Sequence, residues 1–364
     1  GTIGGDIGNA LTPLDIVRFT AAYANFIRWK NSQLVKGSED MVYKGCCQDP
    51  DPNQSNTIII GRDARISGLM VSNIVSGVLI SCGYDVLDLG LSTTPTVEVA
   101  VKLENAAGGI IITASHNPKE WNALKLLDNK GEFLSKQDGD VILDIVESDD
   151  YSFSEIDFLG NYTFDNNYNN RHIEEVLNLP LVDVELVKSA NFKVVLDAVN
   201  SSGGFIIPEL LRRMGVECIK LFCDPNGDFP HNPEPLPENL SDISKLVIQE
   251  NADLGIVVDP DVDRLAFVCE DGSMFGEEYT LVAVADYILQ LKKGNTVSNL
   301  SSTRALYDVS KFHGVNYFAS AVGEVNVVEK MKEVDAVIGG EGNGGIIFPE
   351  LHYGRDSLVG VALF

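Results

Sequence analysis

The stretch GIIITASHNPKEWNALKLLD, residues 109–128, decides the class of fold. Three isoleucines run into the polar turn Thr-Ala-Ser-His-Asn-Pro, and an asparagine and a lysine, Asn122 and Lys125, follow it. A short β-branched run bounded by turn residues predicts a buried strand. Because ligands of open α/β sheets bind beyond the carboxyl ends of strands, the hydroxyl and the imidazole in this turn mark a candidate functional loop.

The same order of strand and helix recurs along the chain. Further strands are predicted at 57–63, 192–199, 254–259 and 335–340. Helices are predicted at 12–30, 64–83, 204–215 and 277–294, the last of them ending in a left-handed cap at Gly294. This alternation indicates parallel α/β layers. Since the polar, Asn- and Asp-rich segment 147–170 is typical of an interdomain connection, we expect domains at 1–160, 161–272 and 273–364.

Length and charge narrow the classes of function. A chain of 364 residues is long enough for two or three domains. Its net charge of −26 argues against nucleic acid and anionic membranes as partners, because both favour basic surfaces. No apolar run approaches the roughly 18 residues that span a bilayer, and the cysteines include no Cys-x-x-Cys pair. We expect a cytoplasmic protein with free structural thiols and no zinc site.

The loop DPDVDR carries three carboxylates directly after a predicted strand. Asp259, Asp261 and Asp263 are spaced two apart, and three hard oxygen donors in one short loop suit Mg²⁺. An EF-hand would need glycine where Arg264 stands, so a calcium loop is excluded. Two alternatives remain: a solvated acidic turn, and an aspartate-nucleophile phosphatase in which Asp259 attacks phosphorus.

Ser115 is the second candidate centre. A lone serine in a turn is more often a capping hydroxyl. Here His116 and Lys125 accompany it, and no Gly-x-Ser-x-Gly elbow is present, so an acyl-transfer nucleophile is not indicated. Together with a Mg²⁺ loop, Ser115 could instead carry a phosphoryl group.

These motifs occur in the order found in a known family. TASHNP, DPDVDRL, GRDARISG (61–68), TTPT (93–96), and GGEGNGG (339–345) followed by GRDS (354–357) resemble the α-D-phosphohexomutase superfamily, which includes phosphoglucomutase, phosphomannomutase and phosphoglucosamine mutase. The resemblance covers the whole chain and is closest to the phosphoglucosamine mutase-like branch. It implies three consecutive related α/β domains with mixed sheets between helices. The family's fourth, C-terminal domain is absent from this chain, which we therefore expect to be a fragment.

The resemblance also implies roles for particular residues. Ser115 resembles the phosphoserine, whose phosphate completes the Mg²⁺ site of Asp259, Asp261 and Asp263; Arg264 resembles its electrostatic neighbour. His116 and Lys125 are candidates for proton transfer. Glu341, Gly342, Asn343 and Arg355 are the expected substrate-binding residues. The reaction implied is the interconversion of hexose 6-phosphate and 1-phosphate through a hexose 1,6-bisphosphate, which is both intermediate and activator.

Some positions depart from the family pattern. The first loop, GTIGGDIG, lacks the usual arginine, Pro260 replaces a glycine, and Asn343 and Gly345 replace a serine and a histidine in the sugar loop. The preferred hexose is therefore open: glucosamine phosphate follows from branch resemblance, and glucose or mannose phosphate is the alternative. A non-catalytic phosphosugar-binding protein is a further alternative. The sequence does not indicate an oligomeric state.

Overall fold

The computed structural model describes residues 1–4, 10–36 and 55–364. These residues form two compact units. Unit 1 contains Gly1–Ser92, Thr96–Ala114 and Glu120–Tyr168, and unit 2 contains Thr93–Pro95, Ser115–Lys119 and Asn169–Phe364. Part of the first loop of the chain and two of the cysteines, Cys46 and Cys47, lie outside the described residues.

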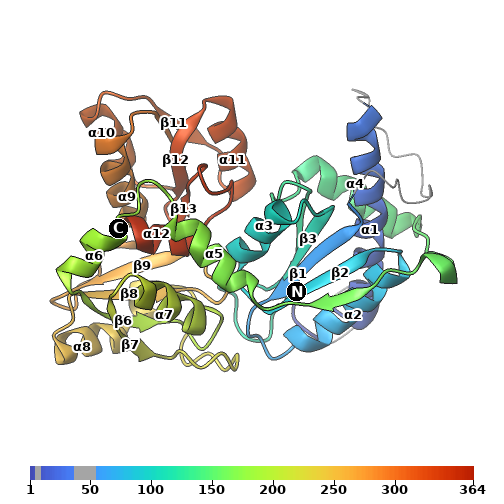
Figure 1. Cartoon of the computed structure of the whole chain (residues 1–364), viewed down its shortest axis with the longest axis horizontal. Coiled ribbons are helices and arrows are strands. Elements are labelled where there is room, and N and C mark those ends of the chain that lie inside the picture. Colours follow the sequence, from blue (N-terminus) through green and yellow to red (C-terminus); the bar gives the residue numbers. More distant parts are fainter. Residues whose placement is uncertain (5–9, 37–54) are drawn as a thin grey trace. The chain divides into compact units, whose positions relative to one another are not determined.

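Unit 1 is built on one mixed sheet of order β4-β3-β1-β2-β5. Its strands are β1 (Thr57–Arg62), β2 (Asp85–Leu91), β3 (Gly108–Ile112), β4 (Leu124–Leu127) and β5 (Tyr162–Phe164). Only β4 runs antiparallel, in a hairpin with β3. The helices of the unit are α1 (Pro13–Lys36), α2 (Gly68–Ser81), α3 (Thr94–Leu103), α4 (Lys136–Ser148) and the 3₁₀ turn η1 (Ile156–Phe158). Figure 1 shows them with the sheet.

Both faces of this sheet are covered, which explains the continuous apolar runs in its strands. Ile58 and Ile60 pack with α1 and α2 in one core cluster, while Ile59 between them belongs to a second cluster with Val97 of α3. Because successive side chains of a strand point to opposite faces, a strand buried on both sides reads as an unbroken hydrophobic run.

Unit 2 holds two further sheets. The first has the order β7-β6-β8-β9 and the second β11-β10-β12-β13. Their strands are β6 (Lys193–Asp197), β7 (Glu217–Leu221), β8 (Leu254–Val258), β9 (Leu265–Cys269), β10 (Asn295–Asn299), β11 (Tyr317–Ser320), β12 (Ala336–Glu341) and β13 (Gly345–Ile347). The helices are α5 (Tyr168–Leu177), α6 (Val184–Ala190), α7 (Gly203–Arg213), α8 (Ser241–Glu250), α9 (Glu277–Leu291), α10 (Ala305–Phe312), α11 (Glu324–Glu333) and α12 (Ser357–Leu363), with the 3₁₀ turn η2 (Pro237–Asn239).

The three sheets repeat one plan. In each, the first strand along the chain lies in the middle with the second and third parallel beside it, and a fourth strand forms an antiparallel hairpin with the third. The loop that follows the third strand is TASHNP in the first sheet, DPDVDR in the second and GEGNGG in the third. The three candidate functional loops therefore occupy equivalent positions in three related α/β layers, as the sequence predicts.

The predicted strands and helices form within a few residues of their expected ends, but one cap does not. α9 ends at Leu291, and Lys292 is extended with φ −133° and ψ 110°, so the left-handed cap predicted at Gly294 is wrong. The glycine has another cause: a Cβ at this position would lie 2.2 Å from Cγ1 of Val337 on β12. Close approach of the chain to the third sheet, not cap geometry, requires the glycine.

Among the described residues, no helix is both long and apolar enough to cross a membrane.

Candidate active site

Ser115 is held in a strained, buried position. It follows β3 in the loop before β4, with φ +48°, and only 8% of it is exposed. Its hydroxyl donates a 2.8 Å hydrogen bond to Oδ2 of Asp259, a residue 144 positions away. Left-handed backbone at a residue other than glycine costs of order 1–3 kcal/mol and persists where surrounding contacts fix it. The loop therefore presents the hydroxyl to the acidic loop of the second sheet.

The acidic loop gathers its three carboxylates in one buried place. Asp259, Asp261 and Asp263 are fully buried, and one oxygen of each lies within 4.8 Å of the others. Oδ1 of Asp259 accepts hydrogen bonds of 3.1 Å from the backbone N–H groups of Asp263 and Arg264. Val262 has φ +64°, a rare conformation for a β-branched residue. The hairpin between β8 and β9 thus turns tightly enough for side chains two apart to converge.

The electrostatics of this loop suit a bound cation. Burial, followed by the charges of Asp263 and Asp261, holds the pKa of Asp259 well above its usual value. A buried set of like charges disfavours ionisation unless a cation compensates it. Hard carboxylate oxygens are the donors that Mg²⁺ prefers, so the donor set fits this ion.

Thr94 supports the acidic loop from the start of α3. Its hydroxyl donates to Oδ2 of Asp261, and its backbone N–H donates to the Asp261 carbonyl at 2.9 Å. In the sequence, TTPT is only one part of the family pattern. No local spacing predicts this contact, because the two residues are 167 positions apart.

His116 and Arg264 flank the serine. Nδ1 of His116 lies 3.4 Å from the Ser115 hydroxyl, and its Nε2 lies 3.8 Å from Glu234. Burial, followed by the charge of Arg264, lowers the pKa of His116, which favours the neutral imidazole. Nη1 of Arg264 pairs with Glu234 at 3.1 Å. A neutral imidazole beside a hydroxyl can accept a proton.

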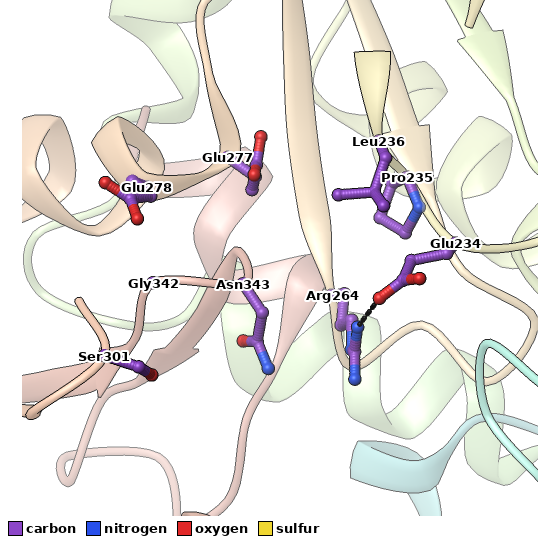
Figure 2. A pocket seen from close by; sticks show the side chains of 9 residues that line it. All are labelled: Glu234, Pro235, Leu236, Arg264, Glu277, Glu278, Ser301, Gly342 and Asn343. Atoms are coloured by element: carbon purple, nitrogen blue, oxygen red, sulfur yellow. Dashed lines mark hydrogen bonds and ion pairs between the residues drawn. The ribbon is translucent and has the colours of Figure 1, made fainter. Parts of the chain in front are cut away.

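The loop after β12 faces a pocket. The pocket has a volume of about 190 Å³, and Figure 2 shows the side chains that line it. It is lined by Glu234, Pro235, Leu236, Arg264, Glu277, Glu278, Ser301, Gly342 and Asn343. Two predicted substrate-binding residues, Gly342 and Asn343, therefore share one cavity with Arg264.

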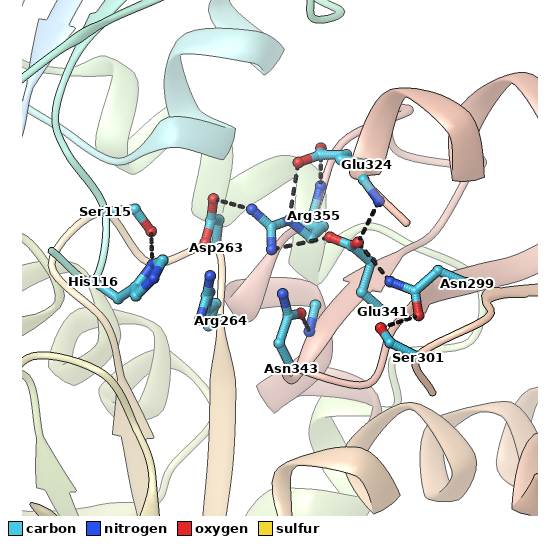
Figure 3. A network of polar contacts seen from close by, with 12 residues as sticks. Ser115, His116, Asp263, Arg264, Asn299, Ser301, Glu324, Glu341, Asn343 and Arg355 are labelled. Carbon is cyan, nitrogen blue, oxygen red and sulfur yellow. Dashed lines mark hydrogen bonds and ion pairs between the residues drawn. The ribbon is translucent and has the colours of Figure 1, made fainter. Parts of the chain in front are cut away.

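Glu341 and Arg355 lie deeper than the pocket. Oε1 of Glu341 accepts from Nδ2 of Asn299 at 2.7 Å, and its other oxygen pairs with Arg355 at 3.2 Å. The guanidinium of Arg355 also contacts Asp263 at 2.8 Å and Glu324 at 2.9 Å. Figure 3 shows this network between the acidic loop and the sugar loop. Arg355 thus contacts three protein carboxylates, and the sequence does not predict these contacts.

Lys125 belongs to the other unit. It lies on β4 in register with Ile111 of β3, and its ammonium lies 5.6 Å over the ring of Phe133. The structure brings the other predicted site residues, Ser115, His116, Arg264, the three aspartates, Glu341, Gly342, Asn343 and Arg355, together in unit 2. The role of Lys125 in proton transfer stays a prediction.

A second buried polar cluster lies next to Arg355. Oδ2 of Asp356 contacts Nε2 of His172 at 2.9 Å and Nε2 of His352 at 3.2 Å, and its Oδ1 accepts from the backbone N–H groups of Leu358 and Val359 in the first turn of α12. Burial, which would raise the pKa of Asp356, is outweighed by His172 and His352, so that pKa lies well below its usual value. Neither histidine belongs to a motif that predicts this cluster from the sequence.

Comparison with known proteins identifies the family. The chain matches the models of phosphoglucomutase/phosphomannomutase α/β/α domain I at residues 46–152, domain II at 170–272 and domain III at 276–364. It is 35% identical over 307 residues to a phosphoglucomutase/phosphomannomutase of Thermococcus kodakarensis, covering 84% of this chain and 67% of that protein. It is 35% identical over 309 residues to a probable phosphoglucosamine mutase of Methanopyrus kandleri, with the same two coverages.

Solved structures show the same fold. A putative phosphomannomutase from Thermus thermophilus superposes with a TM-score of 0.83 at 24% identity, covering 100% of this chain and 76% of that one. The chain belongs to the α-D-phosphohexomutase superfamily, with three of its α/β/α domains present.

Proposed function

We propose that this protein is a Mg²⁺-dependent phosphohexomutase that interconverts a hexose 6-phosphate and the corresponding 1-phosphate. The observation that carries the proposal is the 2.8 Å contact between the Ser115 hydroxyl and one of three buried, converging carboxylates. A hydroxyl that shares a cation site with three carboxylates suits phosphoryl transfer rather than acyl transfer. The family membership of the chain supports the same reaction class.

The proposed reaction moves one phosphoryl group out and another back. Phosphorylated Ser115 donates its phosphoryl group when a sugar hydroxyl oxygen bonds to phosphorus and the serine Oγ–P bond breaks. The proton of that hydroxyl passes to a base, for which neutral His116 and Lys125 are the candidates. The hexose bisphosphate then returns its other phosphoryl group to Ser115, which leaves the isomeric monophosphate and restores the phosphoserine.

The acidic loop is the proposed metal site. Asp259, Asp261 and Asp263 would hold Mg²⁺ together with a phosphate oxygen of phosphorylated Ser115. When bound, the ion supplies neutralisation of the negative charge on the transferring group. Arg264 is fixed by Glu234 next to the same loop and adds a positive charge on the pocket side.

The sugar is proposed to enter the pocket beside the third sheet. Gly342 and Asn343 line it, and Glu341 lies at the base of the same loop to accept hydrogen bonds from sugar hydroxyls. Glucosamine phosphate is the preferred substrate in this proposal, since several relatives are named probable phosphoglucosamine mutases. Glucose or mannose phosphate is the alternative, supported by the relative named phosphoglucomutase/phosphomannomutase. We also propose that the domain boundaries lie at residues 160 and 272.

The geometry favours this reading over an aspartyl-phosphate enzyme. Both oxygens of Asp259 are engaged, Oδ1 by two backbone N–H groups and Oδ2 by Ser115, and the residue is fully buried. An attacking carboxylate needs an accessible oxygen facing the phosphorus atom. Ser115 retains 8% exposure and is the better-placed nucleophile.

The test is a rate comparison in the full-length protein. Interconversion of the 6- and 1-phosphates of glucosamine, glucose and mannose is followed by ³¹P NMR with Mg²⁺ and catalytic hexose 1,6-bisphosphate. The expected result is turnover that disappears in Ser115→Ala and persists in Ser189→Ala, a matched change on exposed α6. A tenfold preference for glucose or mannose phosphate contradicts the glucosamine assignment only. Phosphosugar binding without turnover contradicts the enzyme proposal.

A further inference from the structure

We propose that Glu324 is a positioning residue that acts through Arg355 on the metal loop and the sugar loop at once. The inference rests on the proposed function, since it concerns the same metal and sugar sites. Glu324 is the first residue of α11 and is largely buried, at 9% exposure. Both of its carboxylate oxygens contact Arg355.

Glu324 fixes both the backbone and the side chain of Arg355. Its Oε1 accepts from the Arg355 backbone N–H at 3.0 Å, and its Oε2 accepts from Nε at 2.9 Å. The next residue in the chain, Asp356, is held by contacts with His172 and His352. The guanidinium plane is therefore set by contacts that do not involve a ligand.

The two remaining nitrogens of the guanidinium each contact a carboxylate of a different loop. Nη2 contacts Oδ2 of Asp263 in the metal loop at 2.8 Å, and Nη1 contacts Oε2 of Glu341 in the sugar loop at 3.2 Å (Figure 3). A guanidinium is a rigid planar fork, so its position fixes both acceptors relative to one another. Glu324 thereby determines where one metal ligand and one sugar acceptor lie.

The sugar loop depends on the start of α11 in a second way. Gly323, with φ +112°, donates its backbone N–H to Oε1 of Glu341 at 3.2 Å. The start of α11 therefore contributes to the position of both oxygens of Glu341: Gly323 contacts Oε1, which Asn299 also holds, and Glu324 acts on Oε2 through Arg355. A carboxylate in the first turn of a helix also interacts favourably with the helix dipole.

Three explanations for Glu324 make different predictions. As a positioning residue, its loss weakens Mg²⁺ binding and raises the KM for the phosphosugar together. As a mere partner for a buried cation, its loss lowers the melting temperature and leaves both constants unchanged. As a remote negative charge, it can be replaced by aspartate without effect.

The experiment compares Glu324→Gln and Glu324→Asp in the full-length protein. Mg²⁺ affinity is measured by isothermal titration calorimetry, and KM for glucosamine 6-phosphate is measured separately. The shorter aspartate keeps the charge but cannot reach both N and Nε of Arg355, so it also serves if the glutamine variant fails to fold. Glu333→Gln is the control, because Glu333 is an exposed residue of the same helix paired with Lys330.

We expect the Kd for Mg²⁺ and the KM to rise at least fivefold each in both Glu324 variants and to stay unchanged in Glu333→Gln. Wild-type values in Glu324→Asp, or loss of thermal stability with unchanged Kd and KM, overturn the positioning role while leaving the proposed function intact. Failure of the wild-type protein to bind Mg²⁺ overturns the proposed metal site and this inference with it.

Discussion

Replacing Asp261 with asparagine should stabilise the Mg²⁺-free protein while weakening its response to Mg²⁺. The three loop carboxylates are fully buried and lie within 4.8 Å of one another. At an effective dielectric constant near 20, each pair of unit charges at that distance repels by about 3.5 kcal/mol. Asp261→Asn removes at most two such repulsions and keeps an oxygen for the Thr94 hydroxyl. Because the raised pKa of Asp259 reduces the charge on that residue, only part of this sum is gained. A net gain of about 1–3 kcal/mol in the free energy of unfolding follows by this estimate.

Thermal unfolding monitored by calorimetry, once in EDTA and once in millimolar Mg²⁺, checks this result. In EDTA the variant should melt about 2–6 °C above wild type, taking roughly 2 °C per kcal/mol for a large domain. Mg²⁺ at about 100 times its Kd adds roughly 2.7 kcal/mol to wild type, and less to the variant. Asp271→Asn, in an exposed turn of the same sheet, should leave both responses unchanged. A variant that melts lower in EDTA, or gains as much as wild type from Mg²⁺, refutes the reasoning.

Three further predictions concern residues outside the metal loop. Burial alone would lower the pKa of His231, but Asp197 raises it. The pair therefore stabilises the fold below about pH 6.5, and its contribution is lost as pH rises through the folded pKa. His231→Gln should flatten that part of the curve of melting temperature against pH. Arg65→Met removes the guanidinium that pairs with the fully buried Asp63, and it should lower the free energy of unfolding by about 3–5 kcal/mol in chemical denaturation. A loss under about 1 kcal/mol would contradict a stabilising role of this ion pair. Burial raises the pKa of Cys223 to about 12, so its thiol should react with iodoacetamide far more slowly at pH 8 than a free cysteine does, and fast alkylation would contradict this.

The sequence predicts the layers and the loops because both follow from local patterns. An apolar run such as Ile110–Ile112 followed by TASHNP predicts a buried strand and its polar end without knowledge of the rest of the chain. The equivalence of the three loops also follows, since each comes after a strand of the same kind. The predicted fold class is confirmed by the three domain matches.

Contacts between distant segments could not be predicted in this way. The substrate-binding role of Arg355 stays a prediction, and the sequence does not predict that this residue bridges Asp263, Glu324 and Glu341, which are 92, 31 and 14 positions away. Which carboxylates meet one guanidinium depends on how β12, α11 and the acidic loop are placed by the sheets. Neither the GRDS motif nor the helix start at Glu324 predicts that these carboxylates meet at the guanidinium of Arg355.

Gly294 illustrates the converse case. Glycine after two lysines at the end of a helical pattern predicts a left-handed cap, and that local rule failed. The helix ends three residues earlier, and the glycine is required by the side chain of Val337 on a neighbouring strand. A tertiary contact can demand the same residue type as a local motif, and the sequence alone does not separate them.

The central claim, that Ser115 carries the phosphoryl group beside the acidic loop, is tested most directly by mapping the phosphoenzyme. The full-length protein is incubated with labelled hexose 1,6-bisphosphate and Mg²⁺, treated with hydroxylamine, and digested for mass spectrometry. The account predicts a hydroxylamine-stable phosphate on Ser115 that is absent in Ser115→Ala. A hydroxylamine-labile phosphate that survives Ser115→Ala and disappears in Asp259→Asn would contradict it.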